Sequence, residues 1–184
     1  MADALKPADP DVRLTDGDLT LRPPTVDDAA ELAQIVVANL DHLQPWMTWA
    51  TSDYDEQGAA DYITGKIDPT ARPLLMLDGD GRIVGSTGLN DLDALNRVAN
   101  LGYWVRADAC GRGYATRATD LVARYGIDTV GLQRVEIFMS VHNEPSRLVA
   151  ERSIATYEGI QRNRLRYDGQ QHDAHIYVVL AATL

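Results

Sequence analysis

The stretch GYWVRADACGRGYAT, residues 102–116, combines a strand, a turn with two glycines and the start of a helix. Gly111 and Gly113 allow the backbone there to approach another group closely. The first amides of the following helix lack carbonyl partners, and the helix dipole is positive at that end. The turn is therefore typical of an anion site and suits a pyrophosphate, although a tight strand-to-helix turn alone explains the glycines equally well.

A second patch lies about thirty residues further on. Residues 134–146, RVEIFMSVHNEPS, again predict a strand that leads into a helix, with Pro145 suited to the first helical position. Further motifs stand at fixed places around the two patches: Leu21-Arg22-Pro23, Asp28-Ala29, Leu32, His42-Leu43-Gln44-Pro45-Trp46-Met47, Gly85-Ser86-Thr87-Gly88-Leu89, Ala150-Glu151-Arg152 and Glu158-Gly159.

Taken together and in this order, these motifs resemble the GNAT acetyltransferase superfamily, most closely its RimJ/RimL-like branch, from about Leu21 to Tyr177. The resemblance implies an α/β fold, the GNAT fold, with a mixed, largely antiparallel central sheet, splayed middle strands and helices on both faces. It implies that acyl-CoA enters between the splayed strands.

The hydrophobic pattern predicts the same layout. Residues 1–10 are small and polar and predict a loose tail, and residues 11–184 predict one domain. Expected strands or hairpins cover 12–22, 73–77 with 82–89, 100–106, 134–141, 156–166 and 175–181. Expected helices begin at Thr25 and cover 57–67, 116–125 and 145–152, with Gly126 as a stop for the third.

Composition narrows the function classes. The formal net charge of −10 argues against general nucleic-acid binding and suits a cationic acceptor such as a protonated amine, although acidic surfaces also aid solubility. No apolar run predicts a membrane span, and the N-terminus lacks a signal pattern. Cys110 is the single cysteine, which excludes an intrachain disulfide and a cysteine-based metal cluster. A soluble cytoplasmic protein without a metal is expected.

The resemblance implies acetyl-CoA as co-substrate. Its pantetheine arm would follow the open strand edge, its pyrophosphate would lie on the glycine turn, and the Asn-x-x-Ser motif would bind near the thioester. The residues implied in cofactor binding are Trp104, Val105, Arg106, Cys110, Gly111, Arg112, Gly113, Tyr114, Ala115, Thr116, Asn143 and Ser146. Asn143 and Ser146 could equally be helix caps, and Cys110 a small filler residue.

Acyl transfer from a thioester to an amine needs a base, a stabilised oxyanion and a protonated leaving thiol, and no nucleophilic side chain. Ser146 is the expected hydroxyl donor to the sulfur. Glu136 or His142 could take the amine proton through water, although Glu136 could instead pair with Arg134. An expected acceptor wall comprises His42, Trp46 and Tyr103, which could also be packing residues.

The expected function is therefore an acyl-CoA-dependent N-acyltransferase that transfers acetyl, with other acyl groups, including succinyl, left open. Its acceptor is left open between a protein α-amine and a small amine, and a homodimer is left open too. The alternative is a non-catalytic module that binds CoA or a partner. Two departures from the branch pattern support that alternative: Cys110 replaces a large aromatic residue, and Ser153-Ile154-Ala155 replaces Leu-Gly-Phe, which removes the usual glycine stop.

Overall fold

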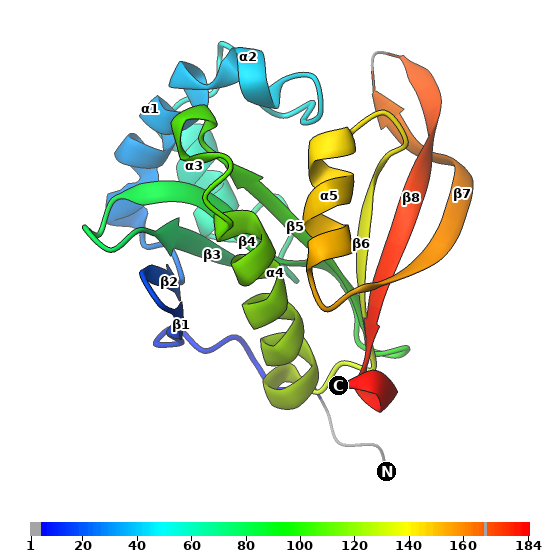
Figure 1. The fold of residues 1–184 in the computed structure, drawn as a ribbon. Helices are drawn as coiled ribbons and strands as arrows, with labels where there is room; N and C mark the ends of the chain where they lie inside the picture. The colour runs from blue at the N-terminus through cyan, green and yellow to red at the C-terminus, as the bar shows by residue number, and fades with distance from the viewer. Residues whose placement is uncertain (1–4, 168) are drawn as a thin grey trace.

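The structure, a computed structural model, describes residues 5–167 and 169–184. It confirms the expected α/β architecture: one eight-stranded sheet in the order β1-β2-β3-β4-β5-β6-β8-β7 with helices on both faces (Figure 1). All neighbouring strands are antiparallel except β5 and β6. The strands are β1 Leu14–Asp16, β2 Leu19–Arg22, β3 Arg72–Leu77, β4 Ile83–Asp93, β5 Val98–Val105, β6 Arg134–Ser140, β7 Thr156–Tyr167 and β8 Gln170–Leu180. The helices are α1 Ala29–Ala38, α2 Leu40–Leu43, α3 Glu56–Ile63, α4 Tyr114–Arg124 and α5 Glu144–Arg152.

The two layers of helices follow from the period-two pattern of the strands. On β3, Leu74 and Met76 join the core cluster that α4 and α5 cover, whereas Leu75 between them packs with α1 and α3. α4 contributes the buried residues Ala118 and Val122 to the first layer. The sheet is therefore buried on both faces in its central part.

Helix α1 begins at an ion pair. The Arg22 guanidinium donates to both carboxylate oxygens of Asp28, at 2.6 and 2.7 Å, and the same carboxylate accepts from the backbone N–H of Thr25 at 2.6 Å. Arg22 lowers the pKa of Asp28 to about 2. The end of β2 is thus joined to the start of α1.

The middle strands separate after a short contact. β5 and β6 pair only at Val98–Asn100 with Arg134–Glu136. Beyond Asn100, β5 continues to pair with β4 along its other edge, while β6 continues to pair with β8. The expected splay is therefore present, and it opens toward the glycine turn.

Helix α4 ends later than the sequence pattern predicts. A wider π-helical segment, Tyr125–Val130, continues it, and Gly131 at φ +93° ends it. Gly126 has a packing role instead, because an added Cβ would lie 3.1 Å from Leu132 Cδ1 and 3.2 Å from Val135 Cγ2. The prediction that Gly126 stops the helix is wrong.

One other segment differs from expectation. Within the predicted tail, Leu5 packs on the core and the Lys6 N–H donates to the Val130 carbonyl, so residues 5–7 are docked; residues 1–4 lie outside the described residues. Helix α5 ends without glycine, since the Ser153 hydroxyl donates to the Ala150 carbonyl at 2.8 Å. The Asp120 carboxylate of α4 then accepts the Ile154 N–H at 2.8 Å, which joins the segment after α5 to α4.

Candidate active site

The free edge of β5 faces the opening between the splayed strands. The Arg106 N–H donates to the Val84 carbonyl of β4, and hydrogen-bonding direction alternates along a strand. The backbone polar groups of Leu101, Tyr103 and Val105 therefore point away from β4, toward β6. The expected open edge is present, but it is centred on Tyr103 and Val105, because the Arg106 amide is already used.

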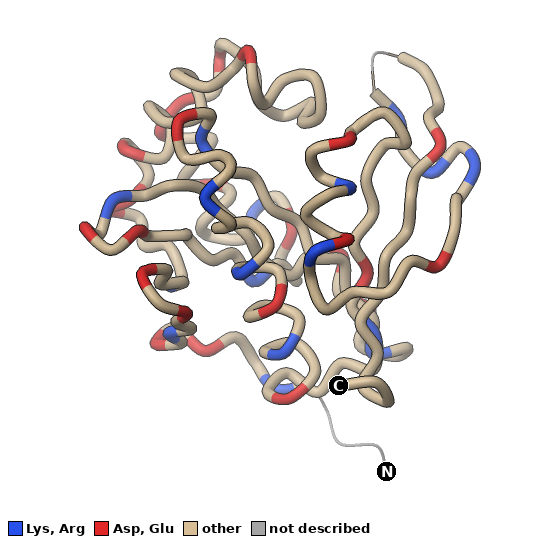
Figure 2. Tube along the Cα trace, viewed as in Figure 1, with Lys and Arg blue, Asp and Glu red and all other residues tan. Residues whose placement is uncertain are grey.

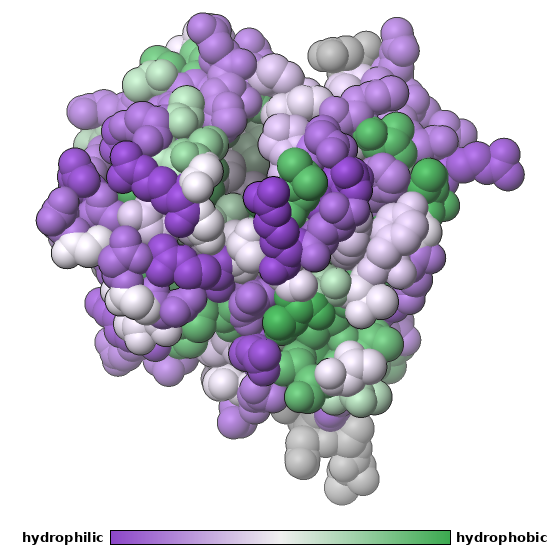
Figure 3. Space-filling view, in the orientation of Figure 1, coloured by the Kyte–Doolittle hydropathy of each residue, from purple (hydrophilic) through white to green (hydrophobic). Residues whose placement is uncertain are grey.

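A cavity of about 510 Å³, the cleft, occupies the splay. Its walls are β5 from Asn100 to Val105, β6 from Ile137 to Ser140, the start of α5, the end of β7 from Leu165 to Tyr167, and the segment 42–49 that follows α1. Figure 3 shows the surface hollowed between the side that carries α1 and the side that carries α5. The cleft leads from the end of the β5–β6 contact toward the glycine turn.

The glycine turn has the geometry of an anion site. Gly111 and Gly113 adopt φ of +77° and +79°, and an added Cβ at either would meet no atom within 4 Å. α4 begins directly afterwards at Tyr114, whose side chain is buried and donates to the Asp18 carboxylate at 3.2 Å. Tyr114 therefore offers only its backbone to a ligand. Cys110 and Ala115 line the cleft at this end.

The side chains near this turn are tied to one another. The guanidinium of Arg106 binds the Asp108 carboxylate at 2.8 and 3.0 Å, and Arg112 donates to the Asp108 carbonyl at 3.4 Å. The Cys110 sulfur lies 3.6 Å from His42 Nε2. Burial and Asp108 raise the pKa of the Cys110 thiol, so the thiolate needed for nucleophilic chemistry is disfavoured.

Ser146 lies at the cleft wall and is held from two sides. Its backbone N–H donates to Asn143 Oδ1 at 3.1 Å, so Asn143 is the N-cap of α5. The Tyr103 phenol lies 2.9 Å from Ser146 Oγ and 3.0 Å from its carbonyl oxygen, to which it donates. Burial raises the pKa of Tyr103 to about 12, so its phenol stays protonated near neutral pH. Tyr103, expected as an acceptor wall, thus contacts the expected proton donor.

Neither expected base lines the cleft. The Glu136 carboxylate accepts from Arg134 Nε at 2.6 Å, and the same guanidinium also binds Glu158 of β7. His142 stands in the turn after β6, where its N–H donates to Ser140 Oγ at 3.2 Å. Since β6 ends at Ser140, the strand alternation does not extend to His142. Glu136 is therefore placed in an ion-pair network outside the cleft.

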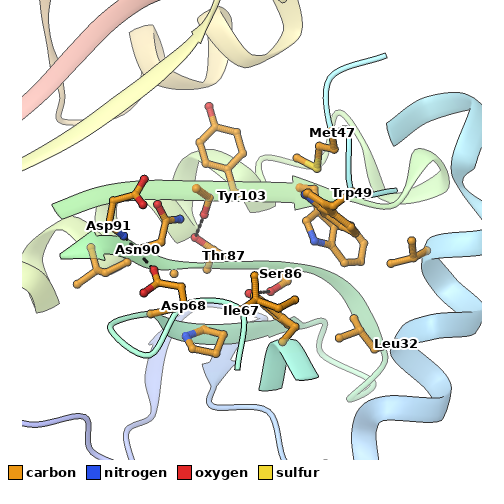
Figure 4. A pocket seen from close by; sticks show the side chains of 18 of the residues that line it. Leu32, Met47, Trp49, Ile67, Asp68, Ser86, Thr87, Asn90, Asp91 and Tyr103 are labelled. Carbon is orange, nitrogen blue, oxygen red and sulfur yellow. Dashed lines mark hydrogen bonds between the residues drawn. The ribbon is translucent and has the colours of Figure 1, made fainter. Parts of the chain in front are cut away.

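A second cavity of about 350 Å³, the side pocket, lies on the α1 and α3 face of the sheet. It meets the cleft at Gly102, Tyr103 and Trp104, which line both cavities together with Met47 and Trp49. His42 and Trp46, the other expected acceptor residues, line only the cleft. Figure 4 shows Met47, Trp49 and Leu32 toward one end of the side pocket, and Asp68, Asn90 and Asp91 at the opposite end.

Charges of both signs are spread along the chain rather than gathered into one basic face (Figure 2). Among the described residues, no group of three or more His, Cys, Asp or Glu side chains is arranged to hold a metal ion. No helix in the described part of the chain is long and apolar enough to cross a membrane.

Comparison with known proteins agrees with this geometry. Residues 18–153 match the family model described as an acetyltransferase (GNAT) domain. YdaF of Bacillus subtilis (strain 168), provisionally named a ribosomal N-acetyltransferase, is 32% identical over 170 residues, which are 88% of this chain and 91% of YdaF.

Two solved structures have the same fold and bound cofactor. Mycobacterium smegmatis RimJ in complex with CoA-disulfide is 27% identical, with a TM-score of 0.81 over 99% of this chain and 89% of RimJ. The microcin C7 self-immunity acetyltransferase MccE, in complex with acetyl-CoA and AMP, is 25% identical, with a TM-score of 0.80 over 90% of this chain and 93% of MccE.

Proposed function

Since this chain belongs to the GNAT family of acetyltransferases, we propose that its cleft holds acetyl-CoA and that it acetylates a primary amine there. It is an N-acetyltransferase by its family and by the names of its relatives. The observation that carries the site assignment is the cleft itself, which joins an open strand edge, a glycine turn and Ser146 in one cavity.

The chain offers a partner for each part of acetyl-CoA. The edge of β5 at Tyr103 and Val105 supplies backbone groups for the pantetheine amides, as an added strand would use them. The amides after Gly113 face a pyrophosphate at a helix N-terminus. The thioester would then lie between β5 and the start of α5, beside Ser146.

The transfer needs one bond made and one broken. The neutral amine attacks the acetyl carbonyl carbon, the carbon–sulfur bond breaks, the nitrogen loses one proton, and the sulfur gains one. Ser146 is placed to donate to the departing sulfur. For that step the Tyr103 phenol donates its one proton to Ser146 Oγ, which frees the Ser146 hydroxyl proton for the sulfur, and Ser146 then regains a proton from water. Because Glu136 and His142 lie outside the cleft, the amine proton is assigned to water rather than to either side chain.

The acceptor and its compartment are inferred from relatives. YdaF bears a name that points to the ribosome, and a relative from Escherichia coli (strain K12), 23% identical over 149 residues, is named a ribosomal-protein-serine acetyltransferase; both names support a protein α-amine and a cytoplasmic location. The acidic net charge of −10 is compatible with an ammonium-bearing acceptor and gives no support to nucleic-acid binding. A homodimer is compatible with the fold, and no residue of a partner is needed to build the cleft.

Product analysis by mass spectrometry tests the function. The protein is incubated with acetyl-CoA and a panel of primary amines and N-terminal peptides, each matched to an alcohol of the same skeleton. N-acetylated products with stoichiometric release of CoA are expected, and alcohols should be poor acceptors because they need a stronger base. CoA binding without transfer to any amine would instead support a non-catalytic module.

A further inference from the structure

Two paired glycines form part of the floor of the side pocket. Gly88 is required by the neighbouring strand, because an added Cβ would lie 2.4 Å from the Arg72 carbonyl oxygen of β3, whereas Gly102 leaves the floor bare. Gly88 of β4 and Gly102 of β5 are cross-strand partners, and both lie on the face that α1 and α3 cover. An added Cβ at Gly102 would lie 3.1 Å from the Asn90 amide nitrogen. On one side of this pair stand Ser86 and Trp104, which are partners in turn. The register of β4 and β5 therefore places the two glycines opposite each other in the floor of the side pocket.

On the other side of the glycines stand two paired asparagines. Asn90 and Asn100 are cross-strand partners, and Asn100 Nδ2 donates to Asn90 Oδ1 at 2.8 Å. Asn100 Oδ1 is buried and has no hydrogen-bond partner among the described residues. A buried carbonyl oxygen without a donor is costly, which makes this atom a natural acceptor for a ligand N–H. Asn90 lines the side pocket and Asn100 the cleft, so the amide pair spans the place where they meet.

Asp68 and Asp91 stand with Asn90 at one end of the side pocket, and the rest of the pocket is mostly apolar. Trp49 packs against Tyr54 and Trp104, with ring centroids 5.5 and 6.5 Å apart. The Tyr62 phenol is paired with the Ser86 hydroxyl at 3.3 Å, which leaves little free polarity at that end. Further apolar lining residues are Leu32, Val36, Met47, Ile67, Ala71, Pro73 and Leu89. A volume of about 350 Å³ with such walls suits an apolar body rather than an extended polar one.

We propose that the side pocket receives the acceptor, and that the acceptor is a primary amine carried on an apolar, ring-sized body. The proposal rests on the acetyl transfer inferred above. The body lies over Gly88 and Gly102 against the aromatic wall. The amine nitrogen lies at the junction with the cleft, where Asn100 Oδ1 accepts one of its N–H groups and orients its lone pair toward the thioester. A free amine and the N-terminus of an apolar peptide share this chemistry.

Binding is measured on the CoA-saturated protein through the fluorescence of Trp49 and Trp104, in a Trp46→Phe background. Benzylamine and the tripeptide Phe-Gly-Gly are the probes, with ethanolamine as the polar comparison. Benzylamine should bind at least about tenfold more tightly than ethanolamine. Comparable binding of Phe-Gly-Gly would identify the acceptor as a peptide N-terminus. Binding of benzylamine without binding of Phe-Gly-Gly would identify it as a free amine. Failure of both apolar probes to bind would overturn the proposal.

Two variants test the position of the acceptor. Gly102→Ala places a methyl group on the floor and should weaken benzylamine binding by about tenfold, while Gly81→Ala, in a distant turn, should not. Gly102 does not have a positive φ, and its neighbours are flexible amide ends, so the alanine can be accommodated. Unchanged benzylamine affinity in Gly102→Ala would place the acceptor elsewhere.

The asparagine contact is tested separately. Asn100→Leu should weaken benzylamine binding at least about fivefold, whereas Asn100→Asp, which retains an acceptor oxygen, should bind at least as tightly as the parent. Equal affinity in the leucine variant would remove Asn100 from the site. Acetyl transfer is scored independently with the amine panel, so a protein that binds these probes but acetylates nothing would refute the proposed function and leave the pocket standing.

Discussion

The Tyr103 phenol on β5 and the Ser146 hydroxyl on α5 lie 2.9 Å apart across the cleft wall. This contact joins the two halves of the splayed sheet at the place where the thioester would react. We expect Ser146→Ala to lower kcat about tenfold or more, because it removes the donor to the departing sulfur. Affinity for CoA, measured by calorimetry, should change much less. A parental kcat would make Ser146 a structural residue only.

Tyr103→Phe extends the same test. If the phenol acts by positioning Ser146, Tyr103→Phe should reduce kcat by less than Ser146→Ala, and the double variant should be no slower than Ser146→Ala alone. The acetyl-CoA KM should stay close to the parental value in all three. Additive losses in kcat would show that Tyr103 acts independently of Ser146.

Gly113→Val should weaken CoA binding by at least about tenfold, or about 1.4 kcal/mol, because the branched side chain would occupy the space before the first amides of α4. Gly81→Val is a matched control, since Gly81 has a φ of +78° and the same open surroundings in the β3–β4 turn. Both variants carry similar backbone strain, and only the first should lose CoA in calorimetry. Equal CoA affinity in the two variants would contradict the pyrophosphate assignment.

Glu136→Gln and His142→Gln should leave kcat within about threefold of the parental value, because neither side chain lines the cleft. The rate should rise with pH until the acceptor amine loses its own proton and then level off, since an ammonium has no lone pair. Exchanging the acceptor for an amine of lower pKa should move this rise to lower pH. If the pH at which the rate rises does not change with the acceptor, or if either variant loses much of its kcat, a side chain of the enzyme acts as the base.

The Arg22–Asp28 pair should make stability depend on acid pH. The pKa of Asp28 is lowered from its ordinary 3.8 to about 2, so its contribution is fully present above about pH 4 and is lost as the pH falls through about 2. Urea unfolding of the parent and Asp28→Asn should differ by about 1–2 kcal/mol at pH 6, and the difference should shrink at pH 2.5. A constant difference would show that the carboxylate charge is not involved.

Local patterns predicted most of the fold and the cofactor side of the site. Some features depend only on residues close in sequence, so the sequence predicts their geometry. They are the glycine turn, the hairpin at Asp78-Gly79-Asp80-Gly81 and Pro145 at the start of α5. The side pocket could not be predicted in this way, because the pairing of Gly88 with Gly102 depends on the register of two strands. That pairing is not visible in either segment alone.

Glu136, one of the two expected bases, does not line the cleft, and the reason is related. Arg134 and Glu136 stand on one face of the same strand, and that local pairing was a foreseeable alternative. Glu158, which binds the other side of the guanidinium, comes from β7 and could not be foreseen. The roles of Met47 and Trp49 in the two cavities were likewise missed, because the segment 42–49 lines them together with strands that are distant in sequence. Asn100 was missed because its partner, Asn90, lies on another strand.

The short contact between β5 and β6 has a consequence for local unfolding. Only three residue pairs, Val98–Asn100 with Arg134–Glu136, carry the ladder from one half of the sheet to the other. Each half has a longer ladder of its own, so the amides at this junction should exchange with deuterium sooner than those in β4 or β8. A cofactor bound between the halves would bridge them, and protection gained on binding should therefore spread well beyond the residues that it touches.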